Sequence, residues 1–148
     1  MKIIEGGVSS PHGFRESGIH CGIRKNRSKK DLALIFSKVP AHTAAVYTTN
    51  LVKGAPLTVT KNNLKNGIAQ AVICNSGNAN TCNANGIEIA EQMCELISKE
   101  LGISATDVVV ASTGVIGQTL DITPIANGIP ALVKELKAES DDAAQAIM

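Results

Sequence analysis

The sequence predicts one α/β domain over residues 1–148, with strands and helices packed in layers. Residues 108–111 (Val-Val-Val-Ala) form a short apolar run, typical of a strand that is buried on both faces. Residues 86–101 instead carry apolar side chains at helical spacing. With no Trp, one Tyr and two Phe, the core must consist of aliphatic side chains, and 148 residues are enough to bury one.

Further strands are expected where β-branched and other apolar residues cluster, at 31–36, 44–49, 56–60 and 68–74. Residues 19–23 alternate only weakly between apolar and polar side chains. The preceding residues 5–18 are rich in Gly, Ser and Pro, which favours an irregular, extended chain.

The helix at 86–101 has both a start and a stop signal. Glu88 and Glu91 lie near its expected beginning and Lys99 near its end, as the helix dipole favours. Gly102 follows as a C-cap, and Cys94 falls on the stripe that should face the core.

A second helix is expected to begin with Thr123 as N-cap and Pro124 in its first turn. Pro130 has no backbone N–H, so we expect a break near 127–128 and a second helical piece over 131–137. Residues 104–107 should form a cap-like turn before the strand at 108.

Composition argues against several classes of partner. The formal net charge is +1 and charged residues make up 18% of the chain, so no strong overall field favours nucleic acid or an anionic membrane surface. The four cysteines lack Cys-x-x-Cys spacing, and the three histidines do not lie at zinc-finger intervals from them. We expect reduced thiols, no metal, no cofactor and, because no apolar leader or long apolar run is present, a cytoplasmic protein.

The strongest candidate site is the turn Ser112-Thr113-Gly114, which follows the strand at 108. Gly114 has no Cβ to screen its neighbours, so backbone N–H groups there could hold an anion or an oxyanion. The structural alternative is a tight turn in which Ser and Thr bond their own backbone. Taken alone, the motif favours the structural alternative.

Three other features have a functional and a structural interpretation. Residues 24–30 hold five cations, and we favour a solvated hairpin tip over a phosphate or nucleic-acid patch because no aromatic residues are interleaved. His20 and Cys21 resemble a catalytic pair, but neighbours on a strand point to opposite faces. The loop Asn75–Asn80 is either functional or a knot of Asx turns. A nucleotide-binding domain is disfavoured because neither glycine-rich phosphate fingerprint is present.

Five segments, in their order and spacing, closely resemble the ornithine acetyltransferase family, also called glutamate N-acetyltransferase or the ArgJ family: Gly18–Ile23, Asp31–Leu34, Tyr47–Asn50, Asn75–Asn80 and Ala111–Gly117. The resemblance implies a DmpA/ArgJ-like layered α/β sandwich whose mixed sheet is completed by a β chain. It also implies an enzyme of arginine biosynthesis that moves acetyl from N2-acetylornithine to glutamate. Some members also accept acetyl-CoA as a donor substrate.

Members of the family cut themselves before a threonine, which becomes the N-terminus of the β chain and the acyl-carrying nucleophile. The resemblance therefore implies that this sequence is the N-terminal portion of the α chain, part of an α2β2 heterotetramer, without the nucleophile. The substrate-binding threonine expected just after Met148 and a later lysine also lie outside it. By resemblance, Thr113 and Gly114 form the oxyanion hole. The alternative is a non-catalytic scaffold that only completes the fold of a partner chain.

Overall fold

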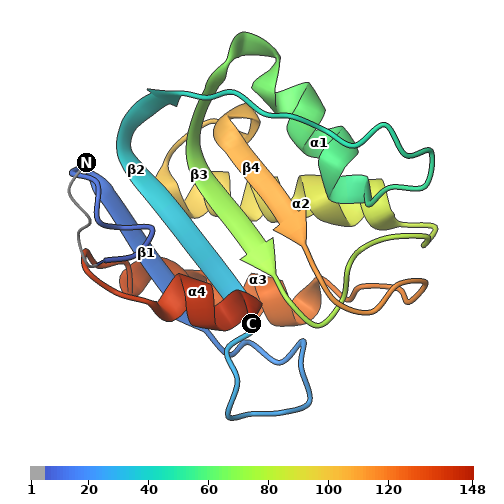
Figure 1. The fold of residues 1–148 in the computed structure, drawn as a ribbon. Helices are drawn as coiled ribbons and strands as arrows, with labels where there is room; N and C mark the ends of the chain where they lie inside the picture. Colours follow the sequence, from blue (N-terminus) through green and yellow to red (C-terminus); the bar gives the residue numbers. More distant parts are fainter. Residues whose placement is uncertain (1–5) are drawn as a thin grey trace.

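The computed structural model describes residues 6–148, and these form a mixed sheet with helices on both faces (Figure 1). Within this part of the chain the sheet has four strands in the order β1-β2-β3-β4. The first two pairs are antiparallel, whereas β3 and β4 are parallel. The strands are β1 (Phe14–Ile19), β2 (Leu32–His42), β3 (Ile68–Asn75) and β4 (Val108–Ser112). The predicted α/β class with a mixed sheet is confirmed.

Three helices cover one face of the sheet and a short fourth helix lies on the other (Figure 1). They are α1 (Ala55–Asn63), α2 (Gly86–Leu101), α3 (Thr123–Lys134) and α4 (Asp142–Ile147), with 3-10 turns η1 (Leu64–Asn66) and η2 (Ala105–Asp107). The parallel pair needs a crossover connection, and α2 supplies it, entering after β3 and leading through η2 into β4. This connection brings the ends of β3 and β4 to the same edge.

The main core lies between the sheet and α1, α2 and α3, and it is aliphatic as predicted. Its fully buried side chains include Leu34, Ile73, Met93 and Ile97. In β4, Val108 and Val110 are buried while Val109 is only partly buried. The expectation of a strand buried on both faces is therefore wrong, because α4 packs over β1 and β2 and leaves the far side of the sheet open at β4.

The strand predicted at 56–60 is wrong, since these residues lie in α1. Pro56 stands in the first turn of the helix, where its missing N–H costs nothing. Val59 and Thr60 are buried, and the Thr60 hydroxyl donates to the Val110 carbonyl and accepts from the Val110 N–H. Packing against β4 overrides the strand preference of these β-branched residues. The strand predicted at 44–49 is also wrong, because those residues form an irregular, mostly exposed connection.

At the N-terminal side, β1 begins at Phe14, inside the segment expected to be irregular, because residues 14–19 pair with residues 32–37 of β2. The extended run expected at 19–23 ends at Ile19. Residues 5–18 were expected to be irregular throughout, and residue 5 lies outside the described residues.

The helix at 86–101 is confirmed as α2, and Gly102 ends it with its N–H donating to the Ser98 carbonyl. The turn at 104–107 is also confirmed, with the Ser104 hydroxyl accepting from the Thr106 N–H. The break expected in the second helix is wrong, because α3 continues through Pro130. Ile129 and Leu132 are buried on either side of it, and their packing offsets the one backbone hydrogen bond that Pro130 removes. Residues 135–137 lie beyond the helix, and Lys137 pairs with Glu16 at the edge of β1.

Candidate functional site at the ends of β3 and β4

The turn Thr113-Gly114 lies where the parallel strands β3 and β4 end side by side (Figure 1). Ligands in α/β proteins commonly bind at the carboxyl ends of parallel strands, because several loops converge there. Both residues are exposed. The Thr113 N–H donates to the carbonyl oxygen of Asn75 at 2.9 Å, which extends the β3–β4 ladder by one bond. The turn is therefore fixed by the sheet and open to solvent.

Gly114 has φ of +130°, a conformation that side chains rarely adopt. A Cβ at this position would lie 2.4 Å from the carbonyl carbon of Gly77 and 2.6 Å from the nitrogen of Asn78. The backbones of the two loops therefore touch, and only glycine fits between them.

The donors of this turn are not equivalent. The Thr113 N–H is used by Asn75, whereas no hydrogen bond within residues 6–148 engages the N–H of Gly114. The sequence predicted several free backbone N–H groups in this turn. Two donors remain available to a ligand: the backbone N–H of Gly114 and the hydroxyl of Thr113. The assignment of both residues to an oxyanion hole stays a prediction.

The Asn75–Asn80 loop is joined to the segment after Gly114 by side-chain and backbone hydrogen bonds. The Asn78 carboxamide oxygen accepts from the Asn80 N–H at 2.8 Å, and its nitrogen donates to the Gln118 carbonyl at 3.1 Å. The Ala79 N–H donates to the Val115 carbonyl at 2.9 Å. The loop therefore contains one Asx turn, at Asn78–Asn80, and it packs against the candidate site, while a functional role for it stays untested.

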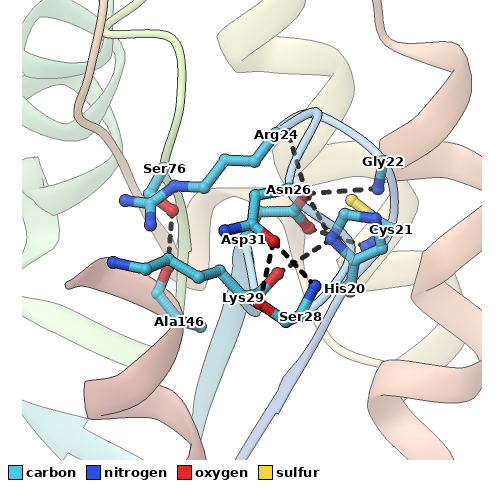
Figure 2. Close-up of polar contacts among 10 residues, drawn as sticks. All are labelled: His20, Cys21, Gly22, Arg24, Asn26, Ser28, Lys29, Asp31, Ser76 and Ala146. Atoms are coloured by element: carbon cyan, nitrogen blue, oxygen red, sulfur yellow. Dashed lines mark hydrogen bonds and ion pairs between the residues drawn. The ribbon is translucent and has the colours of Figure 1, made fainter.

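A second loop reaches the same edge and is organised by Asp31, which is fully buried (Figure 2). Its Oδ1 accepts from the Cys21 N–H at 2.6 Å, and its Oδ2 accepts from the N–H groups of Gly22 at 3.2 Å and Arg24 at 2.9 Å. The Nδ1 atom of His20 lies 3.1 Å from Oδ2 and 2.8 Å from the Lys29 carbonyl oxygen. Three N–H groups and an imidazole thus compensate the buried carboxylate.

This arrangement was not predicted from the sequence. An acidic residue directly after a run of cations and at the start of a strand is the signal that could have indicated it. The basic run itself lies in the connection between β1 and β2, as the hairpin-tip interpretation expected. Lys30 forms an ion pair with Asp142 at the start of α4.

The Asp31 loop and the Asn loop are in direct contact. A Cβ on Gly77 would lie 3.0 Å from Cγ of Arg24 and 3.1 Å from Cγ2 of Ile23. The Ser76 N–H donates to the Asp31 carbonyl at 2.9 Å, and the Ser76 hydroxyl donates to the Ala146 carbonyl at 2.5 Å (Figure 2). Four segments therefore meet at the end of the sheet where β3 and β4 finish: the basic hairpin, the Asn loop, the Gly114 turn and the end of α4.

The four cysteines are free thiols, and three of them are poor nucleophiles. Burial, followed by the charge of Asp31, raises the pKa of Cys21 to about 12. Burial raises the pKa of Cys74 to about 11 and that of Cys94 to about 12. The His20 ring nitrogen contacts Asp31 and Lys29 instead of the Cys21 thiol, so these neighbours do not form a catalytic pair.

In residues 6–148, no three His, Cys, Asp or Glu side chains come together in a way that could hold a metal ion. None of the helices in that range has both the length and the apolar character needed to cross a lipid bilayer.

Fold and site together define an α/β protein with a glycine-dependent, solvent-facing turn at the ends of a parallel strand pair. The model of the ArgJ family matches residues 15–148. The chain is 46% identical over 150 aligned positions to the arginine biosynthesis bifunctional protein ArgJ of Caldanaerobacter subterraneus, covering 100% of this chain and 37% of that protein. The corresponding values for Bacillus subtilis ArgJ are 47% over 147 positions, 98% and 36%. This chain belongs to the ArgJ family, and it spans a little over a third of the length of these relatives.

Two solved structures share the fold of this chain. The crystal structure of ArgJ from Bacillus halodurans superimposes with a TM-score of 0.85 at 41% identity, covering 96% of this chain and 75% of that chain. Ornithine acetyltransferase from Mycobacterium tuberculosis, crystallised with ornithine, superimposes with a TM-score of 0.90 at 37% identity, covering 97% and 79%.

Proposed function

We propose that the complete protein transfers an acetyl group from N2-acetylornithine to glutamate, and that Thr113 and Gly114 stabilise the oxyanion of this reaction. The observation that carries the proposal is that Gly114 is exposed at the ends of β3 and β4, and that its N–H makes no hydrogen bond within residues 6–148. Membership in the ArgJ family supports the acetyl-transfer chemistry.

The reaction runs in two steps through an acyl-enzyme on a threonine supplied by a separate β chain. Attack of the threonine hydroxyl on the acetyl carbonyl forms a tetrahedral oxyanion, which then expels ornithine. Glutamate attacks the resulting ester through its amino group, and a second oxyanion of the same shape breaks the ester bond, which releases N-acetylglutamate and returns the threonine hydroxyl with the proton lost by the amine. One pair of donors therefore serves both steps, and losing one such donor typically reduces turnover by about 100-fold to 1000-fold.

Thr113 and Gly114 have complementary parts in this scheme. Gly114 donates its backbone N–H, whereas Thr113 donates its hydroxyl, since its own N–H is bound to Asn75. Contact with Gly77 holds Gly114 in one conformation, so the donor needs no reorganisation when charge develops.

The proposed partner is a β chain that carries the nucleophile, produced by self-cleavage of one precursor and assembled as an α2β2 heterotetramer. The open face of the sheet supports a further layer of protein, because Ile35, Val72 and Val109 are only partly buried there. Acetyl-CoA is an additional donor substrate in this proposal, and no cofactor is required. Free thiols throughout the chain fit a reducing compartment such as the cytoplasm.

The same open face favours a second candidate, in which this part of the protein is a scaffold that only completes the fold of its partner. The full-length protein distinguishes the two. It should convert N2-acetylornithine and glutamate into ornithine and N-acetylglutamate, and Gly114→Ala should abolish most of that activity. Full activity in the Gly114→Ala variant would assign the residues described here to the scaffold role. A parallel assay with acetyl-CoA and glutamate, without acetylornithine, tests the second donor.

A further inference from the structure

Arg24 is a cation beside the candidate site that has no acidic partner. Its side chain is partly buried, unlike those of Lys25 and Arg27 next to it on the hairpin. The ion pairs within residues 6–148 are His20–Asp31, Lys30–Asp142 and Lys137–Asp142, and none of them includes Arg24. Within residues 6–148 its guanidinium is therefore not engaged by a carboxylate and is free to bind an anion.

Two contacts determine where this side chain starts. The Arg24 N–H donates to Asp31 Oδ2 at 2.9 Å, which fixes the backbone. Its Cγ lies 3.0 Å from the position that a Cβ on Gly77 would occupy, so the stem packs against the Asn loop. In Figure 2 the side chain extends away from the His20–Asp31 cluster towards Ser76.

Gly77 links this cation to the oxyanion turn. Its backbone touches Gly114 on one side, and the Arg24 stem contacts it on the other. Arg24 and Gly114 therefore contact the same residue of the Asn loop. This shared contact suits a ligand that carries an anion a few bonds away from the reacting carbonyl.

We propose that Arg24 binds the α-carboxylate of the amino acid whose acetyl group reacts at Gly114, an inference that rests on the proposed function. In an N2-acetylated α-amino acid, a single carbon separates the carboxylate from the amide nitrogen of the acetyl group. Acetylornithine and acetylglutamate share this unit, so one cation serves both half-reactions. The planar guanidinium matches a carboxylate with two parallel hydrogen bonds, which a lysine cannot reproduce.

The phosphates of acetyl-CoA are the other anions that this residue could meet. The carboxylate is favoured because Arg24 packs against the loop that touches Gly114, whereas the cations suited to a more distant phosphate, Lys25 and Arg27, are exposed at the hairpin tip.

The test uses the full-length enzyme with Arg24→Met, which keeps the stem, Arg24→Lys, which keeps the charge, and the matched control Lys25→Met. For Arg24→Met we expect the KM values of N2-acetylornithine and glutamate to rise by about tenfold or more, because a charged hydrogen bond to bound substrate is lost. The kcat should stay within about threefold of wild type, since this interaction is the same in the ground and transition states. Arg24→Lys should recover part of the loss, and Lys25→Met should behave as wild type.

Three results would overturn the inference. Unchanged KM values in a folded Arg24→Met enzyme would remove the carboxylate role. A raised KM for acetyl-CoA alone would assign Arg24 to a phosphate. A lower melting temperature with unchanged KM would show that Arg24 pairs with a carboxylate elsewhere in the complete chain. Should Arg24→Met fail to fold, the KM ratio between Arg24→Lys and wild type provides the same test.

The proposed function is tested separately, by measuring acetyl transfer with the wild-type enzyme. If the wild-type enzyme does not transfer acetyl groups, the proposed function fails. Calorimetric binding of N2-acetylornithine to wild type and to Arg24→Met then still tests the inference, with at least tenfold weaker binding expected for the variant.

Discussion

The backbones of Gly114 and Gly77 touch, and a Cβ on Gly114 would lie 2.4 Å from the Gly77 carbonyl carbon. The contact joins the turn after β4 to the Asn loop after β3. It leaves no room for a side chain at Gly114, whose φ is +130°. The close approach of the two main chains therefore sets the conformation of the Gly114 turn. A single methyl group on Gly114 would force the two loops apart.

Gly114→Ala should reduce kcat by about 100-fold or more in the full-length enzyme, because the methyl group displaces the turn and with it the N–H donor. Gly117→Ala is a matched control, since Gly117 has φ of +78° with nothing within 4 Å of an added Cβ. The control carries backbone strain of about 1–3 kcal/mol without the collision. Steady-state kinetics and thermal melting of both variants would separate the two effects. Equal losses of kcat would attribute the result to strain alone.

Thr113→Ala tests the hydroxyl, because the Thr113 N–H that bonds Asn75 is kept. We expect kcat to fall by about 100-fold, equivalent to about 2.7 kcal/mol, with KM nearly unchanged, since charge develops on the oxyanion only on the way to the transition state. Thr113→Ser retains the hydroxyl and should keep most activity. A Thr113→Ala enzyme with wild-type kcat would leave Gly114 as the sole donor of this turn.

Local patterns predicted the parts of the fold whose environment is repetitive. The strands at 68–74 and 108–111 and the helix at 86–101 were located from their apolar residues, although the run Val108–Ala111 did not show that one face of its strand is only partly buried. Residues 56–60 differ because Val59 and Thr60 are buried and Thr60 bonds to β4, a contact 50 residues away in sequence that a local pattern does not contain.

In the candidate site, too, the sequence showed the local motif but not the long-range contacts around it. The Ser-Thr-Gly turn was visible as a motif, but the occupation of the Thr113 N–H by Asn75 and the contact between Gly114 and Gly77 both depend on two strands being parallel neighbours. The anchoring of residues 21–24 by Asp31 likewise joins residues on either side of the hairpin tip. Spacing alone does not reveal which carboxylate accepts which N–H group.

Asp31→Asn should destabilise the full-length protein by about 2–4 kcal/mol, because hydrogen bonds to a buried charged acceptor are strong and an amide offers only one accepting oxygen. The chain around Cys21 to Arg24 should loosen first. Urea denaturation would measure the free energy of unfolding, and hydrogen exchange at Gly22 and Arg24 would locate the change. Glu100→Gln, at an exposed carboxylate near the end of α2, is the control and should change stability by less than about 0.5 kcal/mol.

The cysteines should be dispensable for turnover. Replacing Cys21, Cys74, Cys82 and Cys94 one at a time by Ala or Ser is expected to keep most activity, since the proposed nucleophile is a hydroxyl and burial keeps three of the thiols protonated. Thiol alkylation of the native enzyme at pH 8 should modify the exposed Cys82 first. Loss of kcat in any folded single variant would contradict this expectation.

The attachment of α4 should depend on pH through Asp142. Lys137, which lies 2.8 Å from Asp142 Oδ2, and Lys30 together lower the pKa of this carboxyl to about 2. Because the folded pKa is depressed, the stabilisation is fully present above the ordinary value near 3.8 and is lost as pH falls through about 2.

Hydrogen exchange or a fluorescent probe on α4 of the full-length enzyme should therefore report loosening between pH 4 and pH 2. Asp142→Asn should remove most of this pH dependence and leave α4 equally loose at neutral pH, with a small effect on global stability because the pair is near the surface. Asp141→Asn, next to it in sequence, is the control for a change of charge without these ion pairs. A wild-type transition that survives unchanged in Asp142→Asn would show that another group governs the docking of α4.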